Sequence, residues 1–291
     1  MLLPFLRRAA AASIVVASVF AAGPIAAQVN LSGQWAGFYH EDQPDRLPGP
    51  ELGDYGGLPL NAADRMRAQA WNAAILSLPL YQCRVHPVDY ASSFAQIRIW
   101  ETVDPKTQAL IAINVQHFAW NTVRTIWMDG RPHPPEYAQH TAMGFSTGEF
   151  VGQTLRVHTT HLKEGWLRRN GVARSWNAEV TEHFTRHGDY LTWHVYVDDP
   201  AYLEEPFFRN REYVYSETAR MGPYPCESVI EFDVPEDYFP HFLPGENPFL
   251  IEYSQNHGIP YEATLGGAAT MYPEYRERLE ELPVAIYEEA D

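Results

Sequence analysis

Residues 124–161 read R-T-I-W-M-D-G-R-P-H-P-P-E-Y-A-Q-H-T-A-M-G-F-S-T-G-E-F-V-G-Q-T-L-R-V-H-T-T-H. Two runs rich in β-branched and aromatic residues, Thr122–Met128 and Thr154–Leu162, lie on either side of a dense polar connector. The first run leads into Asp129-Gly130, a dipeptide that tolerates positive φ and often closes a hairpin. We therefore predict two strands joined by a connector that carries many of the reactive side chains.

Similar strand-like runs recur on both sides of this block. A first strand is predicted in residues 29–39, and the later runs are Phe94–Val103, Leu110–Phe118, Trp176–Arg186, Tyr190–Val197 and Phe207–Tyr215. This spacing is typical of an antiparallel meander. A meander of this length leaves no exposed edge if it closes on itself. The predicted fold class is all-β: an antiparallel meander that closes into a lipocalin-like barrel.

The flanks of the barrel are predicted to be largely irregular. Asn61 can cap one N-terminal helix. Its apolar face is predicted from residues at helical spacing, namely Met66, Ala70, Ala73 and Ala74. The Pro-, Tyr- and Phe-rich tail that begins at Cys226 is expected to wrap around the barrel, with a short helix near Pro273–Leu282.

The first residues have the pattern of a secretory signal peptide. Two arginines precede a short apolar run, Ala9–Ala22, and small residues follow it. We predict cleavage after Ala27, so that residues 1–27 are the signal peptide and residues 28–291 a single β-barrel domain with irregular flanks. The expected location is periplasmic or secreted.

Charge and cysteine content limit the partners of the chain. The formal net charge is −16, and this argues against nucleic acid and against stable association with an anionic membrane surface. A small molecule is the expected partner, and the oligomeric state stays open. The two cysteines, Cys83 and Cys226, are expected to form a disulfide in an oxidising compartment, although two separate buried thiols are an alternative.

Three segments carry a resemblance to a known family. They are N-T-V-R-T-I-W-M-D-G-R-P-H-P at residues 121–134, G-F-S-T-G-E-F-V-G-Q-T-L-R-V-H-T at residues 144–159 and V-T-E-H-F at residues 180–184. They resemble a large, largely uncharacterised family of exported soil-bacterial proteins, with D-G-R-x-H-P and G-x-S-x-G-x-W-E-G-D-T-L-V-V motifs. The chain departs from the pattern at Phe150, Val151 and Gln153, where the family has Trp, Glu and Asp. The resemblance implies a lipocalin-type barrel and no particular activity.

The G-x-S-x-G segment around Ser146 matches the nucleophile elbow of serine hydrolases. That elbow requires a helix directly after the serine. A β-type run follows here instead, so we interpret the segment as a glycine-flanked turn.

Four histidines near the connector raise the question of a metal site. His158 and His161 are three residues apart on a predicted strand and should point to opposite faces. His133 and His140 lie on the connector and could converge with one of them. No recognised ligand motif is present, so we predict neither a metal nor a cofactor.

Glu182 falls on an apolar strand face. The residues that share this face by alternation are Trp176, Ala178, Val180 and Phe184. A buried carboxylate needs a partner, and Arg124 is the candidate. Alternation places Thr159 and His161 on an inward face as well, which gives a predicted interior set of Arg124, Thr159, His161 and Glu182. This set is either an active site or a structural ion pair.

Arg131 and His133 follow the tight turn and should lie at the rim of the barrel. Arg131 could bind a carboxylate with two hydrogen bonds, and His133, held between prolines, could exchange protons near neutral pH. The alternative is that Asp129 and Arg131 simply lock the loop.

These patterns predict two alternative functions. The first is an exported enzyme that performs metal-independent acid–base chemistry, of lyase, isomerase or hydrolase type, on a small apolar or aromatic substrate. The predicted catalytic residues are His133, His161 and Glu182, and the predicted substrate-binding residues are Arg124, Arg131, His140 and Thr159. The second is a non-catalytic carrier of a small apolar ligand. A cavity open at the Arg131/His133 rim, in which His and Glu converge, favours the enzyme, and a smooth apolar cavity with the polar cluster outside it favours the carrier. A filled barrel would contradict both and favour a surface interaction module.

Overall fold

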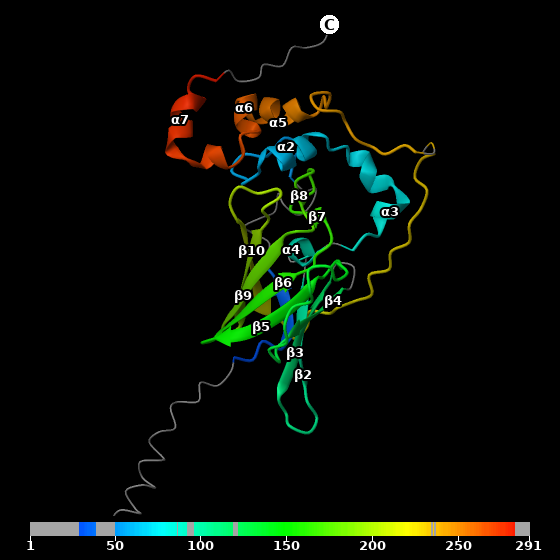
Figure 1. Cartoon of the computed structure of the whole chain (residues 1–291), viewed down its shortest axis with the longest axis vertical. Helices are drawn as coiled ribbons and strands as arrows, with labels where there is room; N and C mark the ends of the chain where they lie inside the picture. The colour runs from blue at the N-terminus through cyan, green and yellow to red at the C-terminus, as the bar shows by residue number, and fades with distance from the viewer. Residues whose placement is uncertain are drawn as a thin grey trace, which may run out of the picture. The chain divides into compact units, whose positions relative to one another are not determined.

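Nine strands of the computed structural model close into a barrel, in the order β1-β11-β10-β9-β6-β5-β4-β3-β2 (Figure 1). The structure describes residues 29–38, 50–85, 87–91, 96–118, 122–233, 235 and 237–282. The predicted signal peptide, residues 1–27, lies outside the described residues. From Leu31 on, the chain forms one compact unit. The predicted all-β barrel is confirmed.

The strands agree closely with the runs predicted from alternation. The barrel strands are β1 (Gly33–Gly37), β2 (Ile97–Val103), β3 (Leu110–His117), β4 (Val123–Trp127), β5 (Phe145–Val151), β6 (Thr154–Thr160), β9 (Glu179–His187), β10 (Tyr190–Asp198) and β11 (Phe207–Tyr215). Between β6 and β9, a two-stranded sheet is formed by β7 (Gly165–Trp166) and β8 (Ala173–Arg174).

One pair of neighbouring strands departs from the predicted antiparallel meander. Strand β5 pairs with β4 in parallel, through Ile126 with Ser146 and Trp127 with Thr147. Parallel neighbours need a long connection that returns the chain to the end where it started, and the whole loop 128–144 provides it. The segment predicted as a glycine-flanked turn is therefore a strand, and this prediction is wrong.

Large apolar side chains pack in the interior of the barrel. Phe184, Trp193 and Tyr213 are almost fully buried. Their rings stack in sequence, with centroids 4.7 Å apart for Phe184 and Trp193 and 6.3 Å apart for Trp193 and Tyr213. A ligand in the interior would need the space that these side chains occupy, so a smooth apolar cavity inside the barrel, the feature that would favour the carrier, has no support.

In the described residues before β2, the chain forms short helical segments: α2 (Ala62–Gln69), η2 (Ala73–Ser77), α3 (Pro79–Gln82) and α4 (Val88–Ala91). The predicted cap is confirmed, because Asn61 Oδ1 accepts hydrogen bonds from the backbone N–H groups of Ala63 and Asp64. The predicted apolar face is wrong. Asp64 and Ala68 are buried and Met66 is exposed, because the Asp64 carboxylate accepts a hydrogen bond from Ala173 N in β8.

The C-terminal part begins as an irregular segment and ends in α5 (Leu250–His257), α6 (Tyr261–Thr264), η4 (Gly267–Met271) and α7 (Pro273–Leu279). The predicted disulfide between Cys83 and Cys226 is present, with the two Cα atoms 5.7 Å apart. Asn247 Nδ2 donates to the carbonyls of Gln69 and Trp71. Figure 1 shows α5 and α6 beside α2. The tail is thus attached to the N-terminal helical segments.

None of the helices in the described ranges combines the length and apolar character needed to cross a membrane.

Candidate functional site

Four histidines meet in a pocket of about 560 Å³ on the outer face of the barrel wall. They come from the loop 128–144 and from the end of β6. We call this the histidine pocket, and it is lined by His133, Pro134, Glu136, His140, His158, Thr160, His161, Trp176, Asn177, Ala178 and Glu179. Its volume lies in the range of small-molecule sites.

Backbone contacts hold the loop against the end of β6. Thr141 N donates to His161 O (2.9 Å), and Lys163 N donates to Thr141 O (2.8 Å). Gly144 then leads the chain into β5 with a φ of 65°. A Cβ atom at Gly144 would lie 2.5 Å from Thr160 O, so this close approach requires glycine.

A continuous chain of hydrogen bonds runs through the histidine pocket. His133 Nε2 is 2.8 Å from Thr147 Oγ1, and His133 Nδ1 is 2.8 Å from Thr160 Oγ1. Thr160 Oγ1 is also 2.8 Å from His161 Nδ1, and His161 Nε2 is 2.9 Å from Pro135 O. We call these four side chains and the terminal carbonyl the relay.

The terminal carbonyl sets the direction of the relay. Because a carbonyl oxygen only accepts, His161 Nε2 carries the proton, and a neutral His161 accepts at Nδ1 from the Thr160 hydroxyl. Thr160 Oγ1 then accepts from His133 Nδ1, and His133 Nε2 accepts from the Thr147 hydroxyl. Burial, followed by the charges of His158 and His161, lowers the pKa of His133. The neutral form required by this pattern is therefore favoured.

The hydrogen bonding of His140 differs from that of the two histidines in the relay. Its Nδ1 lies 3.0 Å from Leu162 O and must donate to that carbonyl. The other ring nitrogen, Nε2, is then an acceptor, and it has no hydrogen-bond partner among the described residues. His140 lines the pocket. The His140 ring packs 5.1 Å from the His161 ring and 5.6 Å from the Trp176 ring, centroid to centroid. His140 is thus the imidazole whose basic nitrogen is available to a bound molecule.

A histidine–carboxylate pair completes the pocket. His158 Nε2 is 2.9 Å from Glu179 Oε2, and the His158 and His133 rings are 4.9 Å apart. Although four imidazoles line the pocket, no three His, Cys, Asp or Glu side chains in the described part of the chain are arranged to hold a metal ion.

The predicted Arg124–Glu182 pair lies on the other side of the barrel wall. Arg124 Nη1 is 2.5 Å from Glu182 Oε2, and Arg124 Nη2 is 3.0 Å from Oε1. Trp193 Nε1 donates to Glu182 Oε1 (2.9 Å), and Thr159 Oγ1 is 3.5 Å from Oε2. Arg124, Glu182 and Thr159 are buried. Glu182 has no histidine among these partners, so its predicted role in orienting a catalytic base has no geometric support.

Alternation along β6 separates the two networks. Thr159 points inward to Glu182, whereas its neighbour Thr160 points outward to the relay. His161 was predicted to point inward with Thr159, and this is wrong. Strand β6 ends at Thr160, and His161 has a φ of 58°, which breaks the alternation and places its ring in the histidine pocket.

Arg131 joins neither network. Its guanidinium pairs with the Asp129 carboxylate, with Arg131 Nη2 2.5 Å from Asp129 Oδ2. The guanidinium carbon also lies 3.5 Å from the centroid of the Trp127 ring. The arrangement is the loop lock that was considered as an alternative, and Arg131 does not line the histidine pocket.

Ser146 is a buried residue of β5. Its hydroxyl is 2.8 Å from Thr159 Oγ1, and β5 is followed by β6 with no helix between them. The expectation that Ser146 is not a nucleophile at an elbow is consistent with this geometry.

Sequence reasoning gave no functional role to several residues of the site, among them His158, Thr160, Glu179 and Trp176 of the histidine pocket and Thr147 of the relay. Alternation could have placed His158 and Glu179 on outward faces, but their proximity depends on the register between β6 and β9, in which His158 opposes Thr181. Trp176 was assigned to the inward face of a strand. It lies in a turn before β9 and is 60% exposed, so this prediction is wrong.

Comparison of the chain with models of known protein families, with curated proteins and with solved structures finds no match in any of the three. The family resemblance seen in the sequence therefore stays a prediction, and the site is interpreted from its own geometry.

Proposed function

We propose that this chain is an exported enzyme that performs acid–base chemistry on a small, partly aromatic molecule bound in the histidine pocket. The observation that carries the proposal is the tautomer of His140. With Nδ1 committed to the Leu162 carbonyl at 3.0 Å, His140 presents a basic Nε2 in a pocket of about 560 Å³. Such a nitrogen is the most frequent general base in enzymes.

His133 and His161 take a different role from the one predicted for them. Both nitrogens of each ring are already hydrogen bonded within the relay. No hydrogen bond among the described residues joins His140 to the relay, and the relay ends at the Pro135 carbonyl. We infer that His140 takes the proton from the substrate and that the relay holds the rings of His133 and His161 in place.

The lining also restricts the substrate. Arg131 is engaged by Asp129, and the lining holds the carboxylates of Glu136 and Glu179 but no lysine or arginine. An uncharged substrate suits this lining better than an anion. The exposed Trp176 ring offers a surface for an aromatic part. Removal of a proton next to a carbonyl and activation of a water molecule both fit one free base, so lyase, isomerase and hydrolase reactions stay open.

A non-catalytic carrier is the second candidate. The observation in its favour is that the relay is already satisfied by its own partners, as expected of a polar network that only shapes a pocket. The disulfide between Cys83 and Cys226 supports an oxidising compartment, and we propose a periplasmic or secreted location for either function.

The test is a screen of residues 28–291 against uncharged aromatic ketones and esters, followed by NMR for both binding and product. We expect turnover that His140→Ala reduces by about 100-fold or more, which is the usual contribution of a general base. His183→Ala is the matched control, because His183 lies on the outer face of β9 and does not line the pocket. Equal turnover by His140→Ala and the wild type would contradict the proposal, and binding without turnover would favour the carrier.

A further inference from the structure

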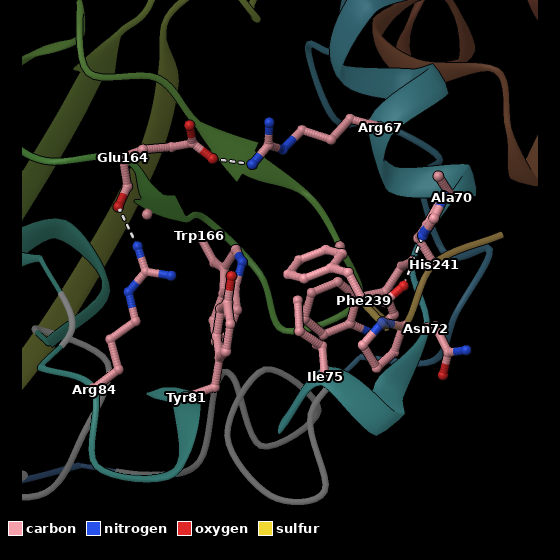
Figure 2. A pocket seen from close by; sticks show the side chains of 14 residues that line it. Arg67, Ala70, Asn72, Ile75, Tyr81, Arg84, Glu164, Trp166, Phe239 and His241 are labelled. Carbon is pink, nitrogen blue, oxygen red and sulfur yellow. Dashed lines mark hydrogen bonds and ion pairs between the residues drawn. The ribbon is translucent and has the colours of Figure 1, made fainter. Parts of the chain in front are cut away.

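A second pocket, of about 350 Å³, lies among the N-terminal helical segments, β7 and the C-terminal tail (Figure 2). We call it the aromatic pocket. Trp166 and Tyr81 form one wall, with nearly parallel rings whose centroids are 6.2 Å apart. Trp71 packs edge-on against Trp166 at 5.2 Å. Phe239 packs edge-on against Tyr81, with ring centroids 6.3 Å apart, and Figure 2 shows Ile75 beside Phe239.

The walls come from distant parts of the chain that are fastened together. The disulfide joins Cys83, next to the Tyr81 wall, to the tail at Cys226. The Gln82 side chain donates to Val229 O (2.9 Å) and accepts from Val229 N (2.7 Å). The aromatic pocket is therefore built by covalent and hydrogen-bonded links and does not depend on loose contact of the tail.

The charge of the pocket lining is opposite in sign to that of the whole chain. Its lining contains two arginines, Arg67 and Arg84, and a single carboxylate, Glu164, in a chain whose formal net charge is −16. Arg67 forms an ion pair with the Glu164 side chain. The lining thus keeps one positive charge in excess, which would attract an anion.

Arg84 carries that excess charge. Its Nη2 donates to the Glu164 backbone carbonyl at 3.1 Å, and its guanidinium carbon lies 5.2 Å from the Tyr81 ring centroid and 6.0 Å from that of Trp166. Among the described residues no carboxylate pairs with Arg84. The guanidinium is therefore held over the rings of the aromatic wall, with N–H donors left for a ligand.

We propose that the aromatic pocket is a binding site for a small planar aromatic carboxylate. The ring of such a ligand would lie against Tyr81 and Trp166, and its carboxylate would accept hydrogen bonds from Arg84. The site is separate from the histidine pocket, shares no lining residue with it, and does not depend on the function proposed there.

The test uses isothermal titration of residues 28–291 with 2-naphthoate and with its uncharged analogue 2-naphthamide. We expect one binding site and at least tenfold tighter binding of the carboxylate. Arg84→Gln should reduce the affinity for 2-naphthoate to that for 2-naphthamide and leave the amide affinity unchanged. Arg98→Gln is the matched control, because Arg98 also lies over an aromatic ring, Trp100, at 5.7 Å, but outside the aromatic pocket.

Two further measurements keep the result unambiguous. Trp176→Ala, in the histidine pocket, should leave the affinity for 2-naphthoate unchanged, and a loss of affinity would assign 2-naphthoate to the histidine pocket. In the wild type, added salt should weaken 2-naphthoate binding and leave 2-naphthamide binding nearly constant, a comparison that needs no folded variant. Equal affinities of the wild type for the two probes, or an equal effect of Arg84→Gln and Arg98→Gln, would overturn the proposal.

Discussion

Replacing Glu182 by Leu tests whether the buried ion pair is required for the stability of the barrel. The change leaves the Arg124 guanidinium buried without its carboxylate and removes the acceptor of Trp193 Nε1. Breaking a buried pair from one side costs about 3–5 kcal/mol, and an orphaned buried donor costs about 1–3 kcal/mol more. At about 2–4 °C per kcal/mol for a domain of this size, we expect the melting temperature to fall by roughly 10–30 °C.

The double variant Arg124→Met/Glu182→Leu separates the charge from the packing. Both charges are then absent and the side-chain volumes stay similar, so only the orphaned Trp193 N–H should remain, at about 1–3 kcal/mol. We therefore expect the double variant to be more stable than the single Glu182→Leu variant. The difference measures the cost of one uncompensated charge inside the barrel.

Urea unfolding followed by far-UV circular dichroism is the appropriate assay. Tryptophan fluorescence is less suitable, because Trp193 contacts Glu182 directly and would report the local change as well as unfolding. Glu182→Gln is the shape-matched control, since it keeps an acceptor for Trp193. A cost below about 1 kcal/mol for Glu182→Leu, far under the expected cost of an unpaired buried charge, would refute the reasoning. So would a double variant as unstable as the single one.

Three further predictions concern the disulfide and two buried titratable groups. Reduction of Cys83–Cys226, which are 143 residues apart in sequence, should lower stability by at most about 4–5 kcal/mol; an unchanged melting temperature in reductant would contradict this. Burial raises the pKa of Asp64 to about 7, so the folded state binds more protons than the unfolded state between about pH 4 and 7, and this contribution to stability is lost as pH rises through that window. Asp64→Asn should remove this slope of up to about 1.4 kcal/mol per pH unit, measured as urea midpoints at pH 4.5, 6 and 8, and an unaltered slope would argue against it. Burial, and secondly the charge of Arg124, lowers the pKa of His117 to about 3. The contribution of His117 to the free energy of unfolding is therefore complete above about pH 6.5 and is lost as pH falls toward 3. His117→Leu should gain stability relative to the wild type in that range, and parallel pH profiles of the two proteins would show that His117 is not responsible.

Local alternation was sufficient to predict every barrel strand except β5, and many of the buried strand faces. Val180, Glu182 and Phe184 are all buried, as a two-residue period requires, because successive side chains of a strand point to opposite faces whatever the partner strand is. The pairing of Arg124 with Glu182 followed from the same rule together with the cost of burying an isolated charge. The disulfide could be predicted from the presence of two cysteines together with the predicted oxidising compartment.

The functional geometry depended on features that alternation does not contain. The parallel pairing of β4 and β5 follows from the path of the loop 128–144. The positive φ of His161 moves its ring from the predicted interior set to the pocket outside.

The approach of His158 to Glu179 depends on the register between β6 and β9. The residues that form the walls of the aromatic pocket lie far apart in sequence and meet only in the folded chain. Composition and charge are sums over the sequence, and strand patterns depend only on neighbouring residues, so all three can be read from the sequence. Convergence of side chains is decided by register and loop path, which form only when the barrel closes.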